Sequence, residues 1–465
     1  MTTTENERHP VFYGPAAPAT EEITAFDLPV TGTIPPELTG RYLRNGPNPL
    51  DLDSPDPHLF IGEGMVHGVR LRDGRAEWYR NRWVRSDQVA EALGEAPRPG
   101  PRFDDQDFAA NTHVIGHAGR TLALVEAGMP MYELTHELDT VGRCDFDGTL
   151  PGGFAAHSKI DPLTGELHAV AYYWGWEHVQ HLVVSPDGKV VRTVDVPVED
   201  GPMVHDFALT EKYVVLLDLP VTFDVTAAEA GVRIPYSWND DRPARVGLMP
   251  RLGGAEDVRW SEVEPCFVFH TLNAYDAGDR VVVDLVAYDR LFVGSRLDGG
   301  TPPALERWTV DPAGTPVERV RLDDRAQEFP RMDERRASRP HRYGYTTVTE
   351  AFDVFLPRGA RDLSSLKDGA FANALLKHDL SAGTRQAHTF SPGAYAGEPV
   401  FVPRHGGTDE DDGYIMTYVN NPERGAADLV ILSAQDFAGP PVATVHLPAR
   451  IPLGFHGNFL PDASY

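Results

Sequence analysis

Residues 66–84, VHGVRLRDGRAEWYRNRWV, contain two β-rich runs on either side of a tight-turn signal. The runs Val66–Arg72 and Ala76–Val84 flank the dipeptide Asp73-Gly74. Asp-Gly pairs tolerate the positive φ angles that a tight antiparallel turn demands. This stretch therefore predicts a β-hairpin.

The same punctuation recurs along the chain. A turn signal at Asp187-Gly188 separates the β-rich runs 181–185 and 190–196. Another at residues 312–314 separates the residues around Trp308 from those around Val320. Other strand-like runs are Thr121–Val125, Leu167–Trp174, Tyr213–Leu219, Arg280–Tyr288 and Tyr414–Val419. Helical signals are few, and predict short helices at Asp87–Leu93 and Ser364–Leu376. The chain reads as all-β.

The chain contains many similar hairpins, and no segment differs from the rest in composition. This favours a closed radial array of hairpins, which leaves few strand edges exposed. A seven-bladed β-propeller would average about 66 residues a blade (465/7), more than the roughly 40–45 of a compact repeat. The surplus would lie in long loops that cap one face. No clean internal period is visible, so the repeats alone also allow a large sandwich or barrel. We expect residues 1–465 to form a single domain, with 1–20 loosely ordered.

Composition excludes several classes of partner. The hydrophobic share of 41% and the charged share of 24% are typical of a globular protein with a core. A net charge of −27 argues against nucleic acid and against purely electrostatic docking on anionic lipid. Two cysteines suit a reducing compartment, and neither a signal peptide nor a membrane span is visible. We expect a soluble, cytoplasmic protein whose contact with membranes is at most peripheral; its oligomeric state is left open.

Four of the 18 histidines stand in an unusual context, because apolar or small residues precede the imidazole and a turn or polar element follows it. They are His157 in GGFAAHSKIDPLTGEL, His205 in GPMVHDFALT, His270 in EPCFVFHTLNAY and His456 in IPLGFHGNFLPD. Neutral imidazole is the commonest metal ligand and suits Fe, Zn or Cu. These four are too far apart for a local clip, so a shared site would require the fold to bring separate strands together. Taken singly, each could equally be a hydrogen-bonded structural histidine.

Three glutamates supply candidate partners for those imidazoles. Glu126 ends the apolar run LALVE, Glu328 lies in AQEFPRMDE, and Glu398 lies in GEPVFVPR. A carboxylate in such apolar surroundings is expensive to bury unless something bonds it. Ligand imidazoles usually donate their second N–H to a carboxylate. The alternative is a salt bridge, which for Glu328 would involve Arg325 or Arg331.

The sequence resembles the carotenoid cleavage oxygenases, specifically their bacterial carotenoid- and apocarotenoid-cleaving branch, from about Leu28 to Asn458. The motifs that carry the resemblance are GRYLRNGPNP, GEGMVHGVRL, ANTHV, LALVEAG, AHSKIDPLTGEL, VHDFALT, FVFHTLNAY, QEFPR, GEPVFVPR and GFHGN. So many blocks in one order make the resemblance specific.

The resemblance implies a seven-bladed propeller with Fe(II) on its axis. The positions that match the iron ligands are His157, His205, His270 and His456. Three glutamates match residues that bond these ligands, and the implied pairs are Glu126 with His205, Glu328 with His270 and Glu398 with His456. Thr112, in ANTHV, matches a residue that crowds one unused coordination position, although it could equally be an ordinary strand threonine. The implied reaction joins O2 to a conjugated carbon–carbon double bond and yields two carbonyl products.

The substrate expectation rests on two departures from related patterns. Stilbene-cleaving relatives carry a lysine before the first glutamate and a tyrosine upstream; here Val125 precedes Glu126, and no tyrosine occurs between Asn81 and Thr112. This favours an apolar polyene over a phenol. Candidate tunnel residues are Phe60, Val125, Phe269 and Phe329, any of which could instead belong to the core.

The second departure is the short stretch 220–245, which carries four acidic residues where carotenoid-cleaving relatives often insert an apolar helix. Shorter apocarotenoids or small aryl-alkenes taken from solution therefore stay possible. The alternatives are cleavage of phenylpropenes or stilbenes, a redox-neutral isomerase, and a non-catalytic propeller scaffold.

Overall fold

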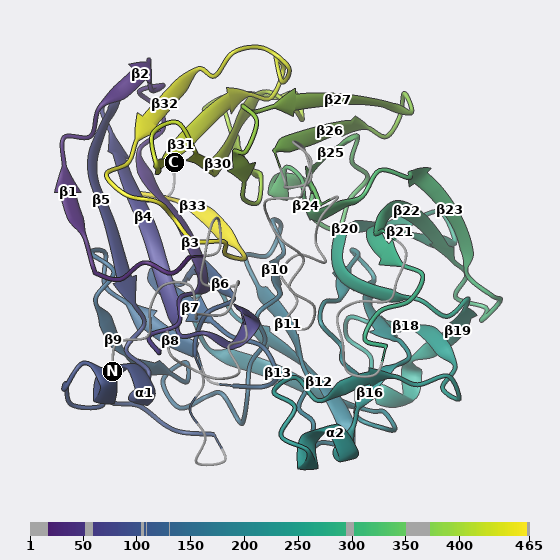
Figure 1. The fold of residues 1–465 in the computed structure, drawn as a ribbon. Helices are drawn as coiled ribbons and strands as arrows, with labels where there is room; N and C mark the ends of the chain where they lie inside the picture. The colour runs from purple at the N-terminus through teal and green to yellow at the C-terminus, as the bar shows by residue number, and fades with distance from the viewer. Residues whose placement is uncertain are drawn as a thin grey trace.

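The computed structural model describes residues 17–51, 59–103, 107, 109–129, 131–293, 302–349 and 373–462. These residues are nearly all in strands or in the turns that join them. Seven sheets of four to six strands stand around a common centre as the blades of a β-propeller, and one extra two-stranded ribbon lies outside them (Figure 1). The all-β, seven-bladed prediction is confirmed.

The two ends of the described chain close the ring. One blade has the order β1-β5-β4-β3-β33, so the C-terminal strand pairs antiparallel with an N-terminal one, Tyr42 facing Phe459. The neighbouring blade takes in β2 from the N-terminal side, which pairs with β32. Figure 1 shows these purple and yellow strands side by side. The strands of the first blade are β1 (Thr24–Phe26), β3 (Gly40–Pro47), β4 (Gly64–Arg72), β5 (Arg75–Trp83) and β33 (Gly457–Pro461).

Five blades are four-stranded antiparallel sheets in simple chain order, except that the β16–β17 ribbon is inserted within one of them. The first two comprise β6 (His113–His117), β7 (Arg120–Leu124), β8 (Met131–Leu134), β9 (Thr140–Cys144), β10 (Ser158–Ile160), β11 (Leu167–Ala171), β12 (His178–Val184) and β13 (Val190–Pro197). The next two comprise β14 (Ala208–Leu209), β15 (Tyr213–Asp218), β18 (Ala244–Pro250), β19 (Arg259–Val263), β20 (Phe267–Ala277), β21 (Arg280–Tyr288), β22 (Ala304–Val310) and β23 (Glu318–Asp323). The fifth comprises β24 (Gln327–Arg331), β25 (Tyr343–Val348), β26 (Ala374–Asp379) and β27 (Thr384–Thr389).

The last blade and the remaining short elements complete the structure. That blade holds β2 (Val30–Gly32), β28 (Tyr395–Ala396), β29 (Val400–Pro403), β30 (Gly413–Asn421), β31 (Ala426–Ser433) and β32 (Ala443–His446). The others are β16 (Val221–Phe223), β17 (Tyr236–Trp238), α1 (Asp87–Ala92), α2 (Val225–Glu229) and the 3-10 turns η4 (Leu59–Ile61), η5 (Ala255–Asp257) and η6 (Glu334–Arg336). Among the described residues, no helix has both the length and the apolar character needed to cross a membrane.

Local sequence signals account for several elements. The predicted hairpin is β4–β5, and its turn residues Asp73 and Gly74 have φ angles of +50° and +70°, which a two-residue primed turn requires. The predicted helix at 87–93 is α1, capped by the Ser86 side chain. The helix predicted at Ser364–Leu376 is wrong where it can be compared, because Ala374–Leu376 lie in β26; residues 364–372, like 1–16, lie outside the described residues.

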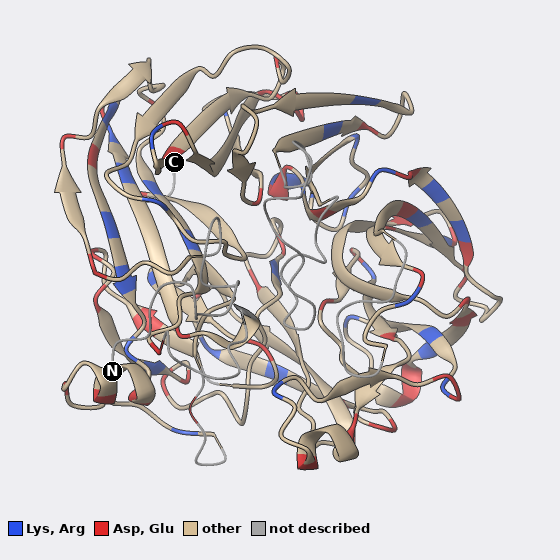
Figure 2. Ribbon diagram, viewed as in Figure 1, with Lys and Arg blue, Asp and Glu red and all other residues tan. Residues whose placement is uncertain are grey.

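The core lies between blades. In one cluster, Leu122 and Leu124 of β7 pack with Leu167 of β11 and Leu182 of β12, so alternate residues of neighbouring blades interdigitate. Each such aliphatic side chain contributes about 1.5–3 kcal/mol through burial. Among the described residues, charged side chains of both signs are interspersed around the ring (Figure 2). The packed blades form a rigid wall around the axis.

Candidate metal centre

Each blade directs one inner-strand position toward the axis. The inner strand begins each of the five four-stranded blades in chain order, whereas β33 takes this place in the first blade and β28 and β29 take it in the last (Figure 1). The candidate residues that lie in, next to or between these strands are Thr112 (before β6), His157 (before β10), His205 (before β14), His270 (in β20), Glu328 (in β24), Glu398 (between β28 and β29) and His456 (before β33). The propeller therefore gathers residues more than 300 positions apart.

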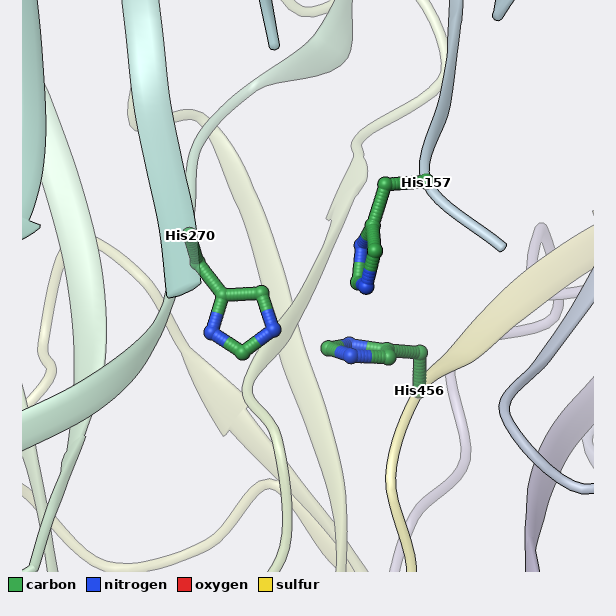
Figure 3. A group of neighbouring side chains, drawn as sticks. All are labelled: His157, His270 and His456. Carbon is green, nitrogen blue, oxygen red and sulfur yellow. The ribbon is translucent and has the colours of Figure 1, made fainter. Parts of the chain in front are cut away.

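The four imidazoles converge. The ring centroid of His157 lies 4.5 Å from that of His205, 5.0 Å from that of His270 and 4.7 Å from that of His456. The His270 and His456 centroids are 4.8 Å apart, and Nε2 of His205 lies 3.3 Å from Nε2 of His270. Figure 3 shows the rings of His157, His270 and His456 turned toward one another. The cluster is as compact as a shared ion requires.

Three of the four rings direct the other nitrogen, Nδ1, at a carboxylate. The contacts run from His205 to Glu126 Oε1 at 2.5 Å, from His270 to Glu328 Oε2 at 2.6 Å and from His456 to Glu398 Oε1 at 2.9 Å. The His270–Glu328 and His456–Glu398 contacts have the distance and the angle of a hydrogen bond. The His205–Glu126 contact is as short, but its angle is not that of a hydrogen bond. Because Nδ1 is engaged outward, Nε2 is the nitrogen left to face the centre in each ring.

His157 supplies the test of whether this donor set fits a metal. It is buried, and its Nε2 has no hydrogen-bond partner among the described residues. An unsatisfied buried imidazole nitrogen is costly unless another species bonds it. Two groups that share His157, one with His270 and His456 and the other with Glu126 and His205, have ligand atoms within 4.8 Å of one another. The arrangement fits a cation that takes nitrogen ligands.

Burial and the neighbouring glutamates shift the pKa values of three of these imidazoles in different directions. Burial lowers the pKa of His157 well below its ordinary value, and the three neighbouring imidazoles lower it further. Burial also lowers the pKa of His456, against the opposing effect of Glu398. Burial would lower the pKa of His270 as well, but Glu328 reverses this and raises it. Metal binding needs neutral imidazoles, which the surroundings of His157 and His456 favour.

The glutamates differ in their other partners. Glu328 also accepts hydrogen bonds from the Tyr288 hydroxyl at 3.0 Å and from the backbone N–H of Phe329 at 2.7 Å. Glu398 lies 2.9 Å from the Arg331 guanidinium and accepts from the backbone N–H of Gly457. The salt-bridge alternative for Glu328 is therefore wrong for Arg331, because that side chain reaches Glu398 instead.

Thr112 is hydrogen-bonded to the backbone of His456. Its carbonyl accepts the backbone N–H of His456 at 3.0 Å, and its hydroxyl donates to Asn111 Oδ1 at 3.0 Å. Thr112 is therefore tied to the segment that carries His456. Its predicted role beside an open coordination position, like the assignment of the four ligands, stays a prediction.

The predicted tunnel residues lie around the imidazoles on different sides. Phe269 meets the His205 ring edge-on at 4.7 Å, and Phe60 stacks at 5.3 Å on Phe455, the neighbour of His456. Val125 belongs to a buried cluster with Met129 and Tyr173.

Phe329 lies 5.5 Å from the His270 ring and 5.4 Å from that of His456, with a φ of +53° that is uncommon for a bulky residue. It is the one predicted tunnel residue that also lines the axial cavity described next.

A cavity of about 760 Å³ runs along the axis and reaches His157, His270 and His456. Its wall contains charged side chains, among them Lys159 and Asp206, which pair at 2.9 Å. Such a wall differs from the apolar lining expected around a polyene.

Sequence reasoning missed three residues of this site. The His113 ring lies 5.2 Å from that of His456, but both its nitrogens are engaged, Nδ1 with the Ala156 carbonyl and Nε2 with Asn458. It is therefore a buried structural histidine, and burial lowers its pKa to about 3. Tyr288 was missed as a glutamate partner, and Arg331 was considered only as a partner of Glu328. Two motifs offered a sequence signal, ANTHV for His113 and QEFPR for Arg331.

Comparison with known proteins agrees with this architecture. The profile of the retinal pigment epithelial membrane protein family matches residues 16–461. The chain is 46% identical to a carotenoid cleavage oxygenase of Mycobacterium tuberculosis, across 99% of this chain and 100% of that protein. It is 32% identical to isoeugenol monooxygenase of Pseudomonas nitroreducens, across 98% and 99% of the two chains. The crystal structure of Pseudomonas brassicacearum lignostilbene dioxygenase superposes with a TM-score of 0.86 at 30% identity, across 97% and 98%. This chain therefore belongs to the carotenoid cleavage oxygenase family, which includes retinal pigment epithelial membrane protein.

Proposed function

We propose that the protein is a non-haem Fe(II) dioxygenase in which His157, His205, His270 and His456 hold the iron and a conjugated carbon–carbon double bond of a carotenoid or apocarotenoid is cleaved with O2. The observation that carries the proposal is the convergence of four imidazoles, three with outward-facing Nδ1 atoms held by carboxylates. Iron bound there would supply the reduced metal that O2 needs in order to react with an alkene. Two carbonyl compounds would be the products.

The chain's own contribution is binding and orientation. Glu126, Glu328 and Glu398 set the tautomer and ring orientation of their histidines. Phe269 and Phe329 pack against the imidazole rings and present apolar surface next to them. No side-chain general base is needed for the overall cleavage.

An apolar substrate is favoured by the surroundings of Val125. It is buried with Met129 and Tyr173, and Phe103 and Trp176 pack against the cluster. The 46% identical relative named as a carotenoid cleavage oxygenase supports the same class. Small aryl-alkenes are the second candidate, because relatives are named as isoeugenol monooxygenase and lignostilbene dioxygenase.

Product analysis tests the reaction. Iron-loaded protein would be incubated in air and anaerobically with a panel of carotenoids, apocarotenoids, stilbenes and isoeugenol, and carbonyl products identified by mass spectrometry. We expect aldehydes or ketones from polyenes only in air. Isomerised products without O2 uptake would instead support a redox-neutral isomerase, and no turnover of any alkene would contradict the proposal.

Metal content tests the ligand assignment. His270→Ala removes one Nε2 donor from the centre, so we expect it to lose most bound iron and all activity. His446→Ala is the control, since His446 lies in β32 and pairs with Asp428 rather than with the cluster. Equal iron content in the two variants, measured by metal analysis of folded protein, would contradict the assignment.

A further inference from the structure

Tyr288 ends β21 and is buried with its hydroxyl against the site. The hydroxyl donates to Oε1 of Glu328 at 3.0 Å, while Oε2 of the same carboxylate accepts Nδ1–H of His270 at 2.6 Å. The phenol and the imidazole therefore share one carboxylate, each on its own oxygen. The Tyr288 ring also packs edge-on against Phe269 at 5.6 Å, which holds the hydroxyl in place.

Among the described contacts, Glu328 is the one of the three glutamates whose negative charge is stabilised by a side-chain hydroxyl. Glu398 has the guanidinium of Arg331 within 2.9 Å. Glu328 is fully buried, and its only ion-pair contact among the described residues is His270 itself. Its negative charge is otherwise balanced by two neutral donors, Tyr288 and the backbone N–H of Phe329.

A hydrogen bond to the charged form of a carboxylate lowers its affinity for a proton. Without the Tyr288 hydroxyl, Glu328 would keep only the Phe329 N–H and the His270 Nδ1–H as donors, and its hydrogen bond to His270 would become stronger. A stronger hydrogen bond at Nδ1 makes the ring a stronger electron donor at Nε2, and stronger donation favours the oxidised state of a bound metal.

We propose that Tyr288 is a positioning residue that shares Glu328 with His270, limits the strength of the hydrogen bond that Glu328 accepts from Nδ1–H of His270, and so favours the ferrous state of the bound iron. This inference rests on the proposed function, because it concerns the same iron site. It adds a residue in a separate strand that is linked to the His270 ring by a chain of two hydrogen bonds.

Tyr288→Phe tests the inference because it removes the hydroxyl and keeps the ring. Tyr345→Phe is a matched control, since Tyr345 is equally buried and its hydroxyl has no hydrogen-bond partner among the residues described. Wild type and both variants would be loaded with iron and titrated anaerobically with redox mediators, with Fe(III) followed by electron paramagnetic resonance. At a fixed solution potential we expect the Fe(III) to Fe(II) ratio of Tyr288→Phe to be about tenfold higher than that of the wild type. This corresponds to a midpoint potential that is lower by roughly 59 mV.

Tyr345→Phe should titrate like the wild type. Equal potentials in all three proteins would overturn the role of Tyr288 and leave the iron site standing, and so would a folded Tyr288→Phe protein that takes up no metal, because the proposal predicts tuning and not loss. A wild-type protein that binds no iron would overturn both the inference and the proposed function.

Discussion

The three glutamates that face the histidine cluster have different surroundings. We therefore expect them to contribute similarly to metal binding but differently to the stability of the metal-free protein. Glu126 has a side chain that is 26% exposed, and its one ion-pair contact among the described residues is with His205. Glu398 is 3% exposed and holds Arg331 as well as His456. Removing the charge of either should weaken metal binding about 10–100-fold, but only one of them also neutralises a buried cation.

We therefore predict that Glu398→Gln destabilises the metal-free protein far more than Glu126→Gln does. Breaking a buried ion pair costs about 3–5 kcal/mol; the lower end applies here because Arg331 keeps a second acidic partner, Glu334. Glu126→Gln should cost less than that, because the Glu126 side chain is partly exposed and pairs with no arginine among the described residues. Chemical denaturation of metal-free protein measures both, and equal losses of unfolding free energy would show that Arg331 does not depend on Glu398.

At the scale of elements, β11 and β12 carry a pair of histidines, His168 and His181, that take no part in the proposed reaction. Nδ1 of His168 lies 3.2 Å from Nε2 of His181, and both rings are buried. Burial, assisted by Arg251, lowers the pKa of His168 to about 4. Burial, assisted by His168 and Arg192, lowers the pKa of His181 to about 3. Both rings are therefore neutral in the folded protein at pH values where unfolded histidine is charged.

This pair predicts an acid-sensitive blade. An unfolded histidine titrates near pH 6.5, so between about pH 6.5 and 4 the unfolded chain binds protons that the folded chain does not. Stability is full above this window and falls as the pH drops through it, by about 1.4 kcal/mol per pH unit for each histidine. The double variant His168→Leu/His181→Leu should flatten the curve of unfolding free energy against pH in metal-free protein. Parallel curves for variant and wild type would contradict this.

The elements also show what the sequence could predict. The Asp73-Gly74 turn and the Ser86 cap are local signals, and the structure has β4–β5 and α1 where they lie. The inner-strand motifs predicted which histidines meet, through a resemblance and not through periodicity. Arg331 could not be assigned locally, because it lies three residues from Glu328 yet pairs with Glu398 on the next blade. Partnerships across blades follow from the closed ring, which no single segment encodes.

At the scale of the whole molecule, the ring closes where the site is built. Strand β33 begins one residue after His456 and pairs along its length with β3. The backbone N–H of Asn45, in β3, donates to the His456 carbonyl at 3.0 Å. The position of one candidate ligand thus depends on how tightly the two ends of the propeller are joined.

Gly40 offers a way to loosen that joint far from the site itself. A Cβ at this position would lie 2.5 Å from the Leu460 carbonyl oxygen and 2.8 Å from Pro461 Cα, and backbone cannot yield without moving β33. We expect Gly40→Ala to lower the unfolding free energy by about 1–3 kcal/mol and to reduce iron retained after dialysis, because β33 carries His456 with it. Gly175→Ala, at an exposed turn where a Cβ would meet only the Tyr173 ring, should do neither. If Gly40→Ala unfolds at a lower denaturant concentration but keeps its iron, closure supports the fold without setting the geometry of the centre.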